Sequence, residues 1–349
     1  MPASLAAAAP TARSVRAARY TTGLITVFAT PTPEMAVAVG RPRTGAGVRA
    51  RPAPLHPAAR LVYHARRRPH ADNPQADRGT YAPMVYKVVE GTGPLVVSMP
   101  HAGALTPEEI AERMTDAGRA AADSDWHVNR LYDFLATLEV PHIRSIYSRY
   151  VCDLNRPPAG SPLYEGAAPS RLCPTHSFDG EPIYQDGCEP DEDEIRSRWR
   201  DYWQPYHLAL ANLMLQAKDR YGVVVLLEAH TVRSQIPSLF EGTLPDFSIG
   251  TRGAASCAPE LRERVAEVVR AAEGYSHTLD GRFQGGFITR SYGRPDEGTH
   301  ALQVELAQRT YMQESPPWTY SNKGGGSVRP HLRRIVETMR EWAEAHANR

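Results

Sequence analysis

Short apolar runs alternate with amphipathic stretches from residue 84 to the end of the chain. Runs of about four to eight apolar residues are typical of buried strands, and apolar residues three or four positions apart are typical of helices. These patterns predict strands at residues 85–90, 94–100, 141–154, 223–230, 285–293 and 301–307. They predict helices at residues 106–114, 125–138, 192–222, 261–273 and 329–346. The first of these helices has Thr106 as its expected N-cap, and the third is expected to bend near Pro205.

Alternation of strands and helices predicts an α/β fold with a mostly parallel, mixed sheet and helices on both faces. We expect one catalytic domain over residues 84–349. In open sheets of this kind, ligands bind beyond the carboxyl ends of the strands. Polar residues that directly follow apolar strands are therefore the first candidates for a functional site.

Residues 1–83 differ in kind from the rest of the chain. The first 80 residues contain twelve Arg, no Lys and three acidic residues, a net charge of +9, whereas the whole chain carries +1. This Ala-, Arg- and Pro-rich leader has little apolar periodicity and is predicted to be disordered. A start codon assigned upstream of Met84, a linker or arm, and a targeting peptide are the three interpretations of it.

Composition excludes several classes of protein. A net charge of +1 gives no overall attraction to nucleic acid or to an anionic membrane. No apolar run approaches the roughly 18 residues of a membrane-spanning helix. The four cysteines are irregularly spaced and form no CxxC pair, which argues against a disulfide framework. We expect a cytoplasmic protein that binds neither nucleic acid nor membrane.

Three predicted strands end in residues that carry out chemistry: His101, His230 and Glu305. A single His after a strand is more often an ordinary hydrogen-bonded residue than a metal ligand. Two such His with an acid favour a catalytic zinc site, which uses three His, Asp or Glu ligands and leaves a position for water. Asp123 and Asp125 stand where a loop enters a predicted helix, and either one is also a suitable N-cap. Asp125 is the favoured ligand.

A family resemblance is carried by the motifs SMPHAG, ADSDWHVNRLYDF, SRYVCDLNRPP, LCPTHSFDG, LEAHTVRSQIPSLFEGTLPDFSIGT, GGFITRSYG and HALQVELAQRTYM. In this order, over about residues 84–345, the chain resembles the N-formylglutamate amidohydrolase family, which has a zinc carboxypeptidase-like fold. The resemblance implies hydrolysis of N-formyl-L-glutamate to formate and L-glutamate, the last step of one histidine-degradation route. It also implies one zinc ion (Zn2+), or another divalent metal, bound by His101 and His230, and we expect the acidic ligand from the DSD segment, with Asp125 favoured over Asp123.

The same resemblance implies roles for other residues. Glu305 is the expected general base, because a charged Glu within an apolar strand is costly to bury without a function. Asn155 and Arg156, in DLNRPP, are the expected binding pair for the substrate's free carboxylate, which the planar fork of Arg suits. Arg290, in ITRSYG, is a further candidate for a substrate carboxylate.

Several positions depart from the family pattern. Glu228 stands where Asp is common, Ser291 where His is common, and Arg252 where Asn is common. Ala104 occupies the place at which zinc carboxypeptidases have their acidic ligand. Two alternatives follow: a related zinc deacylase or carboxypeptidase for another N-acyl amino acid or peptide, and a non-catalytic binding protein with the same fold.

Overall fold

A seven-stranded mixed sheet organises the part of the chain that the computed structural model describes, residues 84–160 and 171–348. The predicted disorder of residues 1–83 lies outside these residues. The strand order is β1-β3-β2-β4-β7-β5-β6. The strands are β1 (Tyr86–Val89), β2 (Leu95–Met99), β3 (His142–Ser145), β4 (Val224–Val232), β5 (Phe247–Gly250), β6 (His277–Leu279) and β7 (Thr299–Ala307).

Parallel pairing dominates the centre of the sheet. Strand β2 pairs in parallel with both β3 and β4, and β4 pairs in parallel with β7. Strand β1 runs antiparallel to β3, β5 runs antiparallel to β7, and β6 is parallel to β5. The carboxyl ends of β2, β4 and β7 therefore lie side by side at one edge, where ligands bind in such sheets.

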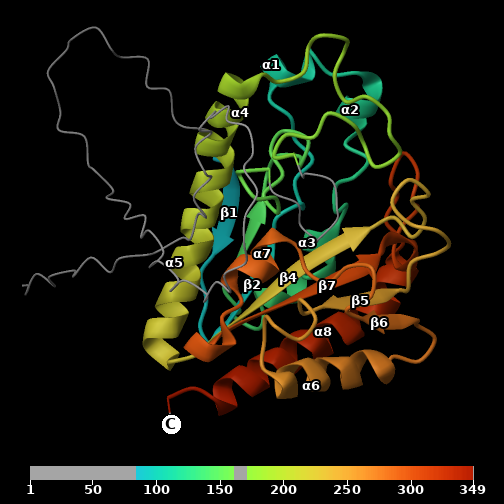
Figure 1. Ribbon diagram of the computed structural model, residues 1–349. Helices are drawn as coiled ribbons and strands as arrows, with labels where there is room; N and C mark the ends of the chain where they lie inside the picture. Colours follow the sequence, from blue (N-terminus) through green and yellow to red (C-terminus); the bar gives the residue numbers. More distant parts are fainter. Residues whose placement is uncertain (1–83, 161–170, 349) are drawn as a thin grey trace, which may run out of the picture. The chain divides into compact units, whose positions relative to one another are not determined.

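Helices cover both faces of the sheet (Figure 1). Helices α5 (Gln204–Tyr221) and α7 (Phe287–Tyr292) pack on one face, and α3 (Val128–Leu131), α6 (Pro259–Arg270) and α8 (Asn322–Ala345) pack on the other. Strand β4 serves both layers, because alternate residues point to opposite faces. Val224 and Leu226 join the core beneath α5, and Val225 and Leu227 join the core above α8. The predicted mixed α/β architecture is confirmed.

The remaining helices are short and lie in the connections. They are α1 (Glu108–Ala111), α2 (Asp116–Ala120) and α4 (Glu192–Arg198), with single 3-10 turns at Asp133–Leu135, Pro295–Glu297 and Gln308–Thr310. Among the described residues, none of the helices combines the length and apolar character needed to cross a membrane.

The strand predicted at residues 285–293 is wrong, because this segment forms helix α7. The first free N–H groups of a helix need acceptors. Here the N–H of Ile288 donates to Asn155 Oδ1 at 2.8 Å, and the N–H of Thr289 donates to Glu228 Oε2 at 2.9 Å. Both acceptors are remote in the sequence, so local pattern does not reveal the helix.

Other predicted elements are shorter or begin elsewhere. The strand predicted at residues 141–154 is limited to β3, and the helix predicted at residues 125–138 is limited to α3 and one 3-10 turn. His127 has a left-handed φ of 63° immediately before α3, so no helix starts at Asp125. Pro107, which makes no side-chain cap, replaces Thr106 at the start of α1.

The bend expected near Pro205 is a π-helical turn at Trp199–Trp203, directly before α5. Pro205 lies in the first turn of α5, but Trp203 before it already has helical φ and ψ, and the N–H of Gln204 donates to the carbonyl of Trp199. The helical backbone is therefore continuous, and the N–H that Pro205 lacks interrupts its hydrogen bonding at this point.

Leu302, at the centre of β7 and 0% exposed, tests the packing between the sheet and α8. We expect Leu302→Ala to lower the free energy of unfolding by about 2–5 kcal/mol, because it removes buried methyl groups and leaves a cavity. Leu208→Ala, on α5 at 45% exposure, is the matched control and should change it by less than about 1 kcal/mol. Urea unfolding followed by circular dichroism measures both, and equal effects would contradict the burial of Leu302.

Candidate metal centre and active site

Strand register places the first two functional side chains. His230 on β4 and Glu305 on β7 are directly paired residues in the parallel ladder. Their side chains therefore leave the same face of the sheet, together with Glu228 and Gln303 two residues earlier on each strand. Gln303 Nε2 donates to Glu305 Oε2 at 2.9 Å. The alternation along each strand thus gathers polar groups at one end of an otherwise apolar face.

His101, Asp125 and His230 form a buried cluster in which one donor atom of each lies within 4.8 Å of the others. His230 Nδ1 is 2.9 Å from Asp125 Oδ2, and His101 Nδ1 is 4.0 Å from Asp125 Oδ1. The backbone N–H of Asp125 donates to the carbonyl of His101 at 3.0 Å, which holds the two segments together. The structure therefore brings together the three residues predicted as metal ligands.

A carboxylate lies behind each imidazole ring of this cluster. His101 Nε2 is 2.7 Å from Asp153 Oδ1, and His230 Nε2 is 2.7 Å from Glu228 Oε1. Such a partner holds the proton on Nε2, orients the ring and leaves Nδ1 as the inward-facing ligand atom. Asp153 was not predicted, although it lies in the same DLNRPP motif as Asn155 and Arg156.

The donor set fits a divalent cation. His101 Nδ1 is buried and has no hydrogen-bond partner among the described residues, although it faces Asp125. Burial and the nearby Arg149 lower the pKa of His101, so its ring is neutral and directs a lone pair toward the cluster. Burial also lowers the pKa of His230, but Glu228 and Asp125 outweigh it and raise that pKa well above its usual range. Two imidazole nitrogens and one carboxylate are ligand types that zinc binds in proteins.

Asp123 is engaged elsewhere. Its Oδ2 accepts hydrogen bonds from the Tyr150 hydroxyl at 2.6 Å and from the backbone N–H of Phe178 at 2.7 Å. Its Oδ1 accepts from Arg233 at 3.2 Å. Asp123 thus fastens three segments around the site, while Asp125 alone of the two faces both His residues.

Glu305 opens onto a cavity of about 160 Å³ that also contains the His-Asp-His cluster. The cavity is lined by His101, Asp125, Arg149, Asn155, Arg156, Phe178, His230, Thr231, Val232, Leu239, Arg282, Phe283, Gly286, Gln303 and Glu305. Burial raises the pKa of Glu305 to about 8, while His230 lowers it in part. A divalent cation in the same cavity would lower this pKa further.

Two cationic side chains enter the cavity from the segment that carries Asp153. Arg149 is buried, donates to Asp153 Oδ2 at 2.6 Å, and lies over the Phe178 ring at 4.8 Å. Arg156 also lines the cavity, with its Nε 3.9 Å from the same carboxylate oxygen. Arg156 was predicted as a substrate-binding residue, whereas Arg149 was not.

Asn155 and Arg290, both predicted to bind substrate, occupy different positions. Asn155 lines the cavity, and its Nδ2 donates to Glu228 Oε1. A side chain on Gly286 would collide with this amide, which explains the glycine at that position. Arg290 is absent from the lining of the cavity, and its Nε donates to the carbonyl of Gly285 at 2.9 Å.

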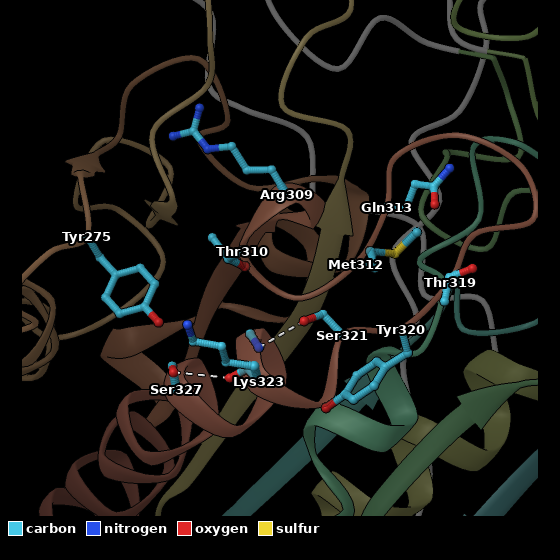
Figure 2. Close-up of a pocket in the computed structure, with 11 residues that line it drawn as sticks. Tyr275, Arg309, Thr310, Met312, Gln313, Thr319, Tyr320, Ser321, Lys323 and Ser327 are labelled. Carbon is cyan, nitrogen blue, oxygen red and sulfur yellow. Dashed lines mark hydrogen bonds between the residues drawn. The ribbon is translucent and has the colours of Figure 1, made fainter.

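A second hollow, of about 580 Å³, lies at the start of α8 (Figure 2). Figure 2 shows the side chains of Tyr275, Arg309 and Lys323 around it, and at the helix start the Ser321 hydroxyl accepts a hydrogen bond from the N–H of Gly324 at 3.0 Å. The described residues that line it include no His, Cys, Asp or Glu. Among its described residues, this hollow therefore offers none of the side chains that usually bind a metal ion.

An α/β sheet with a His-Asp-His cluster and a buried Glu at its carboxyl edge defines a candidate metal-dependent hydrolase. A sequence profile of the N-formylglutamate amidohydrolase family matches residues 93–312. N-formylglutamate deformylase of Pseudomonas aeruginosa is 43% identical over 252 residues, 72% of this chain and 94% of the relative. That of Pseudomonas putida is 42% identical over 253 residues, again 72% and 94%. The chain belongs to the N-formylglutamate amidohydrolase family.

A solved structure shows the same fold. The crystal structure of N-formylglutamate amidohydrolase from Ralstonia eutropha superimposes with a TM-score of 0.58 at 23% identity, covering 75% of this chain and 98% of that one. The predicted family and the prediction of a hydrolase that acts on an amide bond are confirmed.

Measurements of zinc affinity can show which of the two Asp residues in the DSD segment is the metal ligand. We expect Asp125→Asn to weaken zinc binding by more than the roughly 10- to 100-fold that loss of a ligand's hydrogen-bond partner causes. Asp123→Asn, an equally small change, should weaken it less than Asp125→Asn does, since Asp123 contacts neither His. Titration of the metal-free protein with zinc against a competing chelator measures both affinities. If Asp123→Asn lowered the zinc affinity more than Asp125→Asn, Asp123 would be the metal ligand and Asp125 the structural residue.

Proposed function

We propose that this chain hydrolyses N-formyl-L-glutamate to formate and L-glutamate, with one zinc ion held by His101, Asp125 and His230. One observation carries the proposal: Glu305 and the His-Asp-His cluster line the same small cavity. Support also comes from the two relatives named N-formylglutamate deformylase, which match 72% of the chain.

Each residue of the site has a distinct task in this reaction. A divalent ion bound at the cluster supplies a Lewis acid that lowers the pKa of water and polarises a carbonyl oxygen. Glu305 accepts the proton of the attacking water and later donates it to the nitrogen of the departing glutamate. Gln303 holds one carboxylate oxygen of Glu305 and so orients the other. Asp153 and Glu228 fix the two imidazole rings.

Arg156 and Asn155 bind the α-carboxylate of the substrate in this proposal. Arg156 lies beside Asp153, at the wall of the cavity that also presents Arg149. Binding of the carboxylate holds the small formyl group at the cluster. This orientation lowers the entropic cost of reaching the transition state. Arg290 has no direct part, because it does not line the cavity.

Formate release from N-formyl-L-glutamate tests the function directly. We expect the purified chain to release formate, to lose this activity with a chelator and to regain it when zinc is restored. N-acetyl-L-glutamate, N-succinyl-L-glutamate and N-formyl-L-aspartate serve as comparison substrates in the same assay. Absence of formate release in the presence of zinc, or faster turnover of another acyl group, would reject the proposed substrate.

Glu305→Gln separates catalysis from metal binding. We expect it to lower kcat by about 10²- to 10⁴-fold, the usual contribution of a general base, because the amide accepts no proton. Zinc content should stay unchanged, since Glu305 is not one of the three clustered ligands. Glu267→Gln, at an exposed position of α6, is the matched control and should keep full activity. If the kcat of Glu305→Gln were close to that of the wild type, Glu305 would not be the general base.

A further inference from the structure

The cavity presents three guanidinium groups, and they come from two separate parts of the chain. Arg149 and Arg156 belong to one segment and both lie beside Asp153, to which Arg149 donates at 2.6 Å. Arg282 reaches the cavity from the connection between β6 and α7. An N-acyl glutamate carries two carboxylates, so it requires cationic groups at two positions.

Arg282 differs from the other two in how it is paired. It is exposed, and it makes no hydrogen bond, ion pair or aromatic contact with residues 84–160 or 171–348. The N–H groups of Arg282 are therefore available to a ligand, whereas one guanidinium N–H of Arg149 already donates to Asp153. A guanidinium at a cavity wall matches a carboxylate in geometry and charge.

The loop that carries Arg282 is anchored on both sides of it. Before it, Asp280 accepts hydrogen bonds from the N–H and the hydroxyl of Thr251, each at 2.6 Å. After it, the carbonyl of Gln284 accepts from the N–H of Arg252 at 2.6 Å. A cation on a loop that is already ordered loses less conformational entropy when it binds a ligand.

The end of this loop is tied to the catalytic centre. Arg290 Nε donates to the carbonyl of Gly285, and the N–H of Gly286 donates to Gln303 Oε1 at 2.9 Å. Gln303 in turn donates to Glu305. Arg290 is therefore a positioning residue for the loop rather than a direct contact of the substrate.

We propose that Arg282 binds the side-chain carboxylate of the substrate and makes the site selective for acidic N-acyl amino acids. The inference rests on the proposed function and adds the residue that recognises the acidic side chain. Arg156 binds the α-carboxylate and Arg282 binds the side-chain carboxylate. Two separate segments of the chain thus recognise the two acidic groups of the substrate.

Steady-state kinetics with N-formyl-L-glutamate and its neutral analogue N-formyl-L-glutamine test the assignment. We expect Arg282→Gln to lower kcat/KM for N-formyl-L-glutamate by about 10- to 100-fold, mainly through KM, the usual effect of losing a hydrogen bond to a charged group. The kcat/KM for N-formyl-L-glutamine should change far less. Arg282→Lys should recover part of the loss, because it keeps the charge without the fork.

Arg264→Gln, at an exposed position of α6, is the matched control and should leave both substrates unaffected. Thermal melting and zinc content establish that each variant is folded and loaded. Equal losses with both substrates, or none with either, overturn the role of Arg282 while the proposed function stands. A wild-type chain that releases no formate from N-formyl-L-glutamate rejects the proposed function itself, and the assignment of Arg282 with it.

Discussion

The carboxyl ends of β2, β4 and β7 enclose a group of buried acidic side chains, Asp125, Asp153, Glu228 and Glu305. Carboxylates in an apolar interior are costly unless they are paired and hydrogen-bonded. Arg149 and His101 satisfy Asp153, and this pairing holds its pKa well below the usual range despite burial. Asp125 lies beside the two His rings, where a bound cation would compensate its charge in the proposed function.

This demand for charge balance also shapes the surrounding fold. Glu228 accepts hydrogen bonds from Asn155 and from both the N–H and the hydroxyl of Thr289. The same contacts satisfy the start of α7 and hold it over β4 and β7. A polar network, rather than apolar packing alone, therefore decides where this short helix lies. The family resemblance implies an Asp at position 228, and the Glu found here extends the carboxylate's reach into that network by one methylene group.

Much of the fold follows from local pattern. The strands that deliver His101, His230 and Glu305 are recognisable because short apolar runs end in polar residues, and the topology of a parallel sheet then gathers those ends. Helix α7 was mistaken for a strand, since its stabilising partners lie on other segments. Asp153, Arg149 and Arg282 were missed for a similar reason. Each depends on a neighbour that only the three-dimensional arrangement supplies, so a single sequence carries little signal for them.

The pairing of His230 with Glu305 across β4 and β7 has a consequence for folding. The side-chain period of a strand is two residues, so a slip of one residue turns every side chain to the other face. Such a slip would move Glu305 into the apolar layer that β7 shares with α8 through Leu302 and Val304. Circular dichroism would record a similar strand content in both arrangements. The catalytic activity recovered after refolding therefore measures the fraction of molecules in which β4 and β7 pair in the correct register.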